Sequence, residues 1–298
     1  MALYAFDGTW NKDKKGTEGD TNVVWFRDAY AGETCYEEGV GTRFGRFGSI
    51  AGGIAGAGGR SRVRRQMERL KRQLEKGDAT IDVIGFSRGA ALALHFANQV
   101  SFYAQEQKID LPVRFLGLWD TVPSFGVPGN TVDIGWDLDC PDNVAKCFHA
   151  MALDERRKTF PLRRPGVRIQ DARAEGRLFE VWFRGVHSDV GGGNKKPQLS
   201  SIALNWMFAK ARRLGVPLDA SAVVRNRKRM NASATISTHW YDLIKDPDRP
   251  VLWTDRVHQS VHYRRSTWRR RHNHPPDGLT VVDDAGRKVR RFKRPANA

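Results

Sequence analysis

The chain has 298 residues, with 50 Lys and Arg against 33 Asp and Glu and a formal net charge of +17; 40% of its residues are hydrophobic and 10% aromatic. This apolar content excludes a disordered chain, and the length is enough to bury a large core. No apolar run approaches the roughly 18 residues of a transmembrane helix. Residues 1–7 lack a basic region followed by an apolar one, so we expect no cleaved secretory signal. Three cysteines without paired spacing suit synthesis in a reducing cytoplasm.

The positive charge is concentrated in two segments. Residues 60–76 carry eight basic and two acidic side chains, and residues 264–298 carry eleven basic and three acidic ones. We expect these segments to hold the protein at an anionic membrane surface. Nucleic acid is the alternative partner, because Trp268 and Phe292 lie among arginines and could stack on bases. A merely solvated face carries equal weight with that alternative.

Apolar runs alternate with helical patterns along the chain, which is typical of a parallel α/β sheet. Strands are predicted at residues 3–6, 81–86, 113–119 and 179–183, and helices at residues 62–76, 88–100, 144–153 and 201–214. The glycine-rich residues 39–59 are expected to form a loop, and beyond residue 219 the pattern weakens into short basic pieces. The simplest organisation is one α/β domain over residues 1–265, followed by a basic carboxy-terminal extension over residues 266–298.

The sharpest motif is Gly85-Phe86-Ser87-Arg88-Gly89, a G-x-S-x-G pattern between a predicted buried strand and a helix of small residues. This is the context of a nucleophile elbow, a tight strand-to-helix turn that projects a serine hydroxyl from the sheet. The alternative is that Ser87 has no catalytic role and two glycines flank it by chance. Because both flanking elements are present, the motif predicts that Ser87 is a catalytic nucleophile.

A serine needs a base, and a histidine suits that task. His187 follows a predicted strand and precedes a glycine-rich loop that could approach the serine without obstruction. His258 and His262 are rivals, because they also lie downstream of the serine and a candidate acid. We expect His95 to be a core residue and His149 to lie in a helix.

Asp120 is the leading candidate for the acid that orients the histidine. The strand at residues 113–119 delivers it to the carboxyl edge of the sheet, where catalytic groups of open α/β sheets collect. It could instead only cap the turn that follows. Asp189 is the alternative acid but lies two residues from His187, and Asp154 sits in a charged segment.

The oxyanion of an acyl-transfer reaction needs backbone donors. The Arg88 amide at the start of the elbow helix is the first candidate, and the amides of Gly8 and Thr9, after the first strand, are the second. Asp7 could hold that loop in place. A second interpretation, in which Asp7 is itself an aspartyl nucleophile, ranks below the elbow serine. The sequence indicates no cofactor, and His272 and His274 lack a third ligand for a metal site.

Six motifs together resemble one family, in the order Phe6-Asp7-Gly8-Thr9-Trp10-Asn11, Gly39-Val40-Gly41-Thr42, the elbow, Gly117-Leu118-Trp119-Asp120-Thr121-Val122, Asp154-Glu155-Arg156 and Val186-His187-Ser188-Asp189-Val190-Gly191-Gly192. The chain resembles an α/β-hydrolase domain family, long of unknown function, that includes type VI secretion phospholipase effectors of the GxSxG class. The resemblance covers roughly residues 1–265 and implies an α/β-hydrolase-like fold: a mostly parallel central sheet flanked by helices.

The resemblance also implies a triad of Ser87, Asp120 and His187, which favours His187 over His258, and structural roles for Asp7, Asp154 and residues 257–261. We therefore expect a serine hydrolase, a phospholipase-like esterase that works through an acyl-enzyme. As an effector it would be exported by a type VI secretion system and would need an immunity protein. The alternatives are a cytoplasmic esterase for non-lipid substrates and a nucleic-acid-binding or regulatory protein on a hydrolase scaffold.

Overall fold

The computed structural model describes residues 1–8, 11, 13–39, 54–123, 135–166, 176–237, 247–263, 273 and 275–289. Its strands are β1 (Ala2–Phe6), β2 (Glu33–Glu37), β3 (Ile81–Phe86), β4 (Val113–Trp119), β5 (Cys147–Ala152), β6 (Leu178–Phe183), β7 (Arg256–His258) and β8 (Thr280–Val282). Its helices are α1 (Asn22–Ala29), α2 (Ile54–Glu75), α3 (Arg88–Gln107), α5 (His187–Gly191), α6 (Ser200–Arg213), α7 (Ala220–Arg229) and the 3₁₀ helix η2 (Gln259–Tyr263).

The strands form a single sheet in the order β2-β1-β3-β4-β5-β6-β7-β8. Each pair of neighbouring strands is parallel. The expected parallel α/β fold is therefore confirmed. The last strand, Thr280–Val282, lies within the expected carboxy-terminal extension and pairs with β7 at the edge of the sheet.

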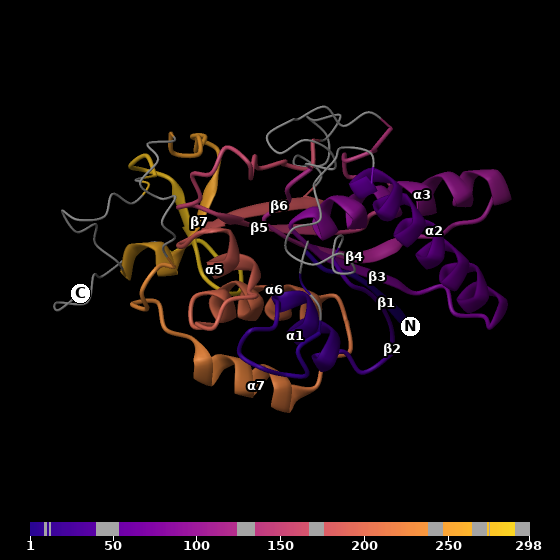
Figure 1. The fold of residues 1–298 in the computed structure, drawn as a ribbon, viewed down its shortest axis with the longest axis horizontal. Coiled ribbons are helices and arrows are strands. Elements are labelled where there is room, and N and C mark those ends of the chain that lie inside the picture. The colour runs from indigo at the N-terminus through magenta and orange to yellow at the C-terminus, as the bar shows by residue number, and fades with distance from the viewer. Residues whose placement is uncertain are drawn as a thin grey trace.

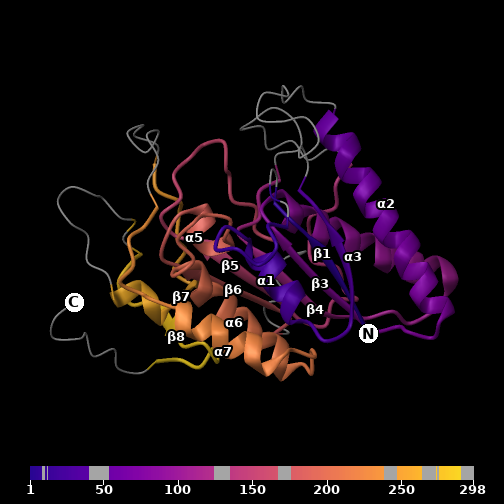
Figure 2. The ribbon, with the colours of Figure 1, turned by 60° about the horizontal axis from the view of Figure 1, so that its bottom comes forward.

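Helices cover both faces of the sheet (Figure 1, Figure 2). The pair α2 and α3 packs on one face, where it meets Tyr4, Phe6 and Val83. The other face carries α1 and α6, which meet Leu3, Ala5 and neighbouring strand residues, and α7 packs on the outer side of these two helices. None of the described helices is long and apolar enough to cross a bilayer.

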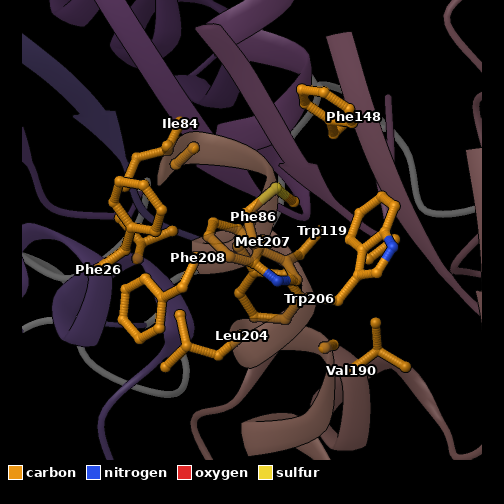
Figure 3. Close-up of a cluster of buried hydrophobic side chains, with 14 of the residues drawn as sticks. Phe26, Ile84, Phe86, Trp119, Phe148, Val190, Leu204, Trp206, Met207 and Phe208 are labelled. Carbon is orange, nitrogen blue, oxygen red and sulfur yellow. The ribbon is translucent and has the colours of Figure 1, made fainter. Parts of the chain in front are cut away.

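Aromatic side chains fill the core between the sheet and α1 and α6 (Figure 3). The Phe26 ring stacks at 5.7 Å on Phe115 and at 5.3 Å on Phe208, and its edge meets Trp119 at 6.1 Å. Such aromatic pairs stabilise a core by about 0.5–1.5 kcal/mol beyond the burial of their surface. This packing holds the end of β4, and with it Asp120, in one position.

The predicted helix at residues 144–153 is wrong, because residues 147–152 form the buried strand β5. A strand buried on both faces reads as a continuous apolar run, which helical periodicity fits equally well. The segment after residue 219 begins with α7, a regular helix that the weak apolar pattern did not indicate. The glycine-rich loop lies mostly outside the described residues, and its last part belongs to α2.

The turn between β3 and α3 brings three backbones into contact. Ser87 has a φ of 58°, a left-handed conformation that non-glycine residues rarely adopt. A Cβ atom on Gly85 would lie 2.5 Å from the Gly89 carbonyl oxygen, and one on Gly89 would overlap the Phe6 carbonyl at the end of β1. Glycine at both positions is what allows the strained turn to form against β1.

We expect Gly89→Ala to lower the free energy of unfolding by about 1–3 kcal/mol, the usual cost of overpacking, because the Phe6 carbonyl is backbone and cannot move aside. Chemical denaturation measures the loss. Gly19→Ala is the control: its Cβ would meet the flexible Lys14 side chain, and a change within about 0.5 kcal/mol is expected. Equal stabilities of the two variants would contradict this account of the turn.

Candidate active site

Ser87 and Asp120 leave the sheet side by side. Phe86 pairs with Trp119 in the ladder between β3 and β4, so the next residue of each strand lies at the carboxyl edge. The Ser87 amide donates to the Trp119 carbonyl at 3.0 Å, and the Val122 amide donates to the Ser87 carbonyl at 3.2 Å. Asp120 also has a positive φ, 42°. Both residues thus occupy tight turns that point their side chains away from the regular strand direction.

His187 is brought to Asp120 by the turn that follows β6. It is the first residue of α5, and its Nδ1 atom lies 2.6 Å from Asp120 Oδ2. With a proton on Nδ1 donated to the carboxylate, Nε2 keeps its lone pair and can accept a proton. The expected acid and base, which are 67 residues apart in the chain, are therefore hydrogen-bonded.

Two aromatic rings enclose the His187 imidazole. Phe86 lies 4.6 Å and Phe160 4.9 Å from its centroid. The glycine-rich loop after His187 approaches the elbow closely, since a Cβ atom on Gly191 would overlap the Phe86 ring. The expectation that glycines allow this loop to reach the serine turn agrees with this contact.

Arg249 contacts the second oxygen of the Asp120 carboxylate. Its Nη1 lies 2.6 Å from Asp120 Oδ1, which also accepts a hydrogen bond from the Ala152 amide at 2.8 Å. The guanidinium donates further to the carbonyls of Ala152 and Phe160. Sequence reasoning missed this residue, because Arg249 lies outside any helix or strand and in no recognisable motif.

Charge compensation sets the protonation of this pair. Burial alone would raise the pKa of Asp120, but the Arg249 guanidinium and His187 outweigh it and hold the pKa well below its usual range. Burial lowers the pKa of His187, and the neighbouring Asp120 and Glu155 carboxylates only partly offset this. At neutral pH the arrangement therefore holds an ionised aspartate next to a neutral imidazole.

Glu155 fixes the backbone at His187. Its Oε2 accepts a hydrogen bond from the His187 amide at 3.1 Å, and Arg157 forms a 2.7 Å ion pair with the same carboxylate. Although burial raises the pKa of Glu155, Arg157 lowers it to about 2. The Arg157 guanidinium also lies 3.7 Å over the Phe160 ring. This ion pair thus supports both the backbone and one wall of the imidazole.

Two of the three expected oxyanion donors, Arg88 and Gly8, lie in the described part of the chain. Arg88 is the first residue of α3, a position whose amide has no partner within the helix. The Gly8 amide donates to Asp7 Oδ1 at 2.7 Å, while Asp7 Oδ2 accepts from Thr21 and Tyr36. Asp7 therefore holds the loop after β1 in place, and Thr9 lies outside the described residues.

The alternative residues have other partners. His258 Nδ1 lies 2.9 Å from Ser260 Oγ, and its Nε2 lies 3.3 Å from Asp284. Asp189 accepts hydrogen bonds from Ser237 and from the Val186 amide, which fixes the turn that carries His187. Neither of these contacts reaches Ser87 or Asp120.

Other polar side chains of the described region have partners that suit structural roles. His149 lies on β5, contrary to the expected helix, and its Nδ1 is 3.4 Å from Glu180. Asp154 accepts from Gly185, Arg184 and Asn273. Within the described ranges, no group of three or more His, Cys, Asp or Glu side chains is arranged to hold a metal ion.

The family described as "T6SS, Phospholipase effector Tle1-like, catalytic domain" matches the chain over residues 3–101 and 94–210. The chain belongs to this family of type VI secretion phospholipase effectors. The match spans the elbow, Asp120 and His187, and it confirms the resemblance drawn from the motifs. No curated protein sequence matches the chain.

Among the solved structures that resemble this Tle1-like chain are two longer proteins. One is an uncharacterized protein from Pseudomonas aeruginosa, 21% identical, with a TM-score of 0.51 over 79% of this chain and 51% of that one. The other is the Tle1 effector bound to the VgrG spike of the type 6 secretion system, 24% identical, with a TM-score of 0.45 over 64% of this chain and 50% of that one. The chain thus spans about half the length of each.

We expect Arg249→Met to raise the pKa of His187 in the Tle1-like domain. Without the guanidinium, Asp120 interacts more strongly with the imidazolium, so His187 becomes neutral only at higher pH. Titration of the His187 side chain by nuclear magnetic resonance measures the shift. Arg114→Met, which breaks the Arg114–Asp82 ion pair elsewhere in the fold, is the matched control. An unchanged His187 pKa in folded Arg249→Met would contradict the coupling.

Proposed function

We propose that this chain is a serine hydrolase that cleaves acyl esters of glycerophospholipids through an acyl-enzyme. The observation that carries the proposal is the 2.6 Å contact between His187 and Asp120 beside the strained Ser87 turn. A neutral imidazole oriented by a buried carboxylate, next to a serine on a nucleophile elbow, is the arrangement that activates a hydroxyl. Membership of the Tle1-like family supports lipids as the substrate class.

In the proposed mechanism, Ser87 Oγ attacks the acyl carbonyl and His187 Nε2 takes the serine proton. The carbonyl oxygen becomes an oxyanion, which accepts hydrogen bonds from the Arg88 amide and from the loop after β1. In that loop Thr9 is the proposed donor, because the Gly8 amide is held by Asp7 Oδ1. His187 then gives its proton to the leaving alcohol, and an acyl-enzyme remains on Ser87. Water attacks this ester with the same base, which releases the fatty acid and restores the serine.

We expect Ser87→Ala and His187→Ala each to lower kcat for phospholipid hydrolysis in liposomes by at least about 10⁴-fold, because the nucleophile and its base act as a unit. His258→Ala is the control and is expected to keep activity, since its contacts lie elsewhere. A fluorophosphonate probe should label wild type at Ser87 and leave Ser87→Ala unlabelled.

Two results would overturn parts of this proposal. Activity that survives His187→Ala but is lost in folded His258→Ala would exchange the base. Labelling of Ser87 with hydrolysis of soluble esters but not of liposomes would keep the serine mechanism and replace the lipid substrate with a non-lipid ester.

We further propose that α2 holds the enzyme at anionic lipid. This helix runs along the outside of the fold beside α3 (Figure 2), and Arg64, Lys71 and Arg72 are exposed on it. Arg65 and Arg69 also belong to α2, but each of them forms an ion pair with Glu37. The second basic segment falls largely on residues 264–272 and 290–298, which lie outside the described residues.

The double reversal Arg64→Glu/Arg72→Glu should weaken binding to phosphatidylglycerol vesicles by at least tenfold, because each cation near an anionic surface contributes about 1 kcal/mol. Vesicle co-sedimentation measures this. Arg225→Glu/Lys228→Glu on α7 changes the net charge equally and is the control. Equal loss in both variants would rule out α2 as the docking face, and tighter binding to DNA than to vesicles would favour nucleic acid.

As a family member, the chain is also proposed to be delivered by a type VI secretion system. A producing cell that makes a phospholipase effector needs protection from it, so an immunity protein that blocks the site completes the proposal.

A further inference from the structure

A cavity that includes none of the candidate catalytic residues lies between the sheet and the end of α6. Its volume is about 220 Å³, and side chains of β5, β6, β7 and β8, the last turns of α6 and the turn after β8 line it. Aromatic, aliphatic and basic residues line it: Lys146, Phe148, Phe179, Val181, Trp206, Lys210, Arg213, Leu214, Arg256, Val282, Ala285 and Gly286. The volume is below the roughly 300–1,000 Å³ of drug-sized sites, so it suits a small molecule.

Three aromatic rings form the wall of this cavity. Phe148 stacks on Phe179 at 5.2 Å and meets the edge of Trp206 at 5.9 Å; Figure 3 shows Phe148 and Trp206 near each other. The Trp206 side chain is fully buried, and its Nε1 has no hydrogen-bond partner within the described part of the chain. Because this N–H is shielded from solvent, Trp206 contributes its ring to the wall of the cavity.

All the charged side chains that line the cavity are basic: Lys146, Lys210, Arg213 and Arg256. Lys210 is only 6% exposed, and its Nζ lies 5.3 Å over the Trp206 ring. Among the described residues no carboxylate pairs with this ammonium. The nearby Asp283 is bound by Arg287, and Asp284 lies 3.3 Å from His258.

Other contacts account for only part of this positive charge. Lys146 donates to the Gly176 carbonyl, and Arg213 donates to the Ala285 carbonyl. Lys210 and Arg213 belong to the last turn of α6, where the helix dipole favours cations. The dipole does not explain Lys146, which directly precedes β5, or Arg256, which is the first residue of β7. Burial also lowers the pKa of Lys210 to about 8, and an anion beside it would reverse that effect.

We propose that this cavity binds a small organic anion with an apolar body, of the class of a medium-chain carboxylate. The anionic group contacts Lys210, and the body lies among Phe148, Phe179 and Leu214. None of the candidate catalytic residues lines the cavity, so the proposal is independent of the hydrolase proposal.

Isothermal titration calorimetry with octanoate tests the site. 1-Octanol is the uncharged control of the same chain length, and acetate is the control anion that lacks an apolar chain. We expect octanoate to bind wild type and to bind Lys210→Met at least tenfold more weakly, because the buried cation is lost. Arg212→Met is the control: it removes a cation from the same last turn of α6 but lies outside the cavity.

Binding should also weaken as pH rises through about 8, because Lys210 then loses its charge. Burial is outweighed by hydrogen bonds to Arg287 and His258, which lower the pKa of Asp283 and of Asp284, so both carboxylates near Lys210 stay ionised over this range. The other charged side chains that face the cavity are Lys146, Arg213 and Arg256. Circular dichroism checks folding, and Lys146→Met at the partly exposed rim replaces Lys210→Met if that variant does not fold.

No octanoate binding to wild type, or equal loss in the Lys210→Met and Arg212→Met variants, would overturn the proposal. If 1-octanol bound as tightly as octanoate, the site would not require an anion. If acetate bound as tightly as octanoate, the site would not require an apolar chain. None of these measurements needs catalysis, so a failure here is distinguishable from a failure of the Ser87 mechanism.

Discussion

The candidate active site depends on the ionised carboxylate of Asp120, which is completely buried. A buried charge is tolerated only when it is paired and hydrogen-bonded. Asp120 meets this requirement with three donors from separate parts of the chain: the Ala152 amide at the end of β5, His187 at the start of α5, and Arg249. The carboxylate, which follows β4, thereby links the end of β5, the start of α5 and the segment that carries Arg249. The Arg249 guanidinium therefore already balances the negative charge of the Asp120 carboxylate before His187 takes a proton.

Phe86 connects this charge arrangement to the packing of the elbow. Its ring fills the space that side chains on Gly8 and Gly191 would need, and it also lies against the His187 imidazole. The backbone of the turn, the loop after β1 and the histidine are thus positioned by a single aromatic side chain. Changes in this packing would move the nucleophile and its base together.

Local signals made most of the fold and the candidate triad predictable. Ser87 and Asp120 directly follow β3 and β4, and His187 comes four residues after the end of β6, so polar residues close behind apolar runs marked all three. The same signal failed at residues 144–153, where an apolar run buried on both faces fits a helix as well as a strand. Arg249 could not be found from local patterns at all. Its contact with Asp120 joins residues 129 positions apart, and the segment that carries it has no periodicity. The predicted roles of Arg88, Gly8 and Thr9 remain predictions.

The candidate active site and the basic cavity differ in chemistry. Carboxylates gather at the carboxyl edge of the sheet, where they position His187, whereas cations and aromatic rings gather under the end of α6 around Lys210. Trp206 and Phe183, in contact at 5.5 Å, lie between these regions. The same helix, α6, therefore contributes to the core behind the candidate active site and to the basic cavity.

The strand order has a consequence for how the protein is made. From β3 to β8 the spatial order of the strands equals their order in the chain, so each newly synthesised strand can add to the free edge of the growing sheet. During synthesis the amino-terminal part of a chain emerges first. Ser87 and Asp120 emerge early, His187 only after β6, and Arg249 just before β7. The residues of the serine turn are therefore available long before the charges around Asp120 are complete, and the last of these charges comes when most of the chain has emerged.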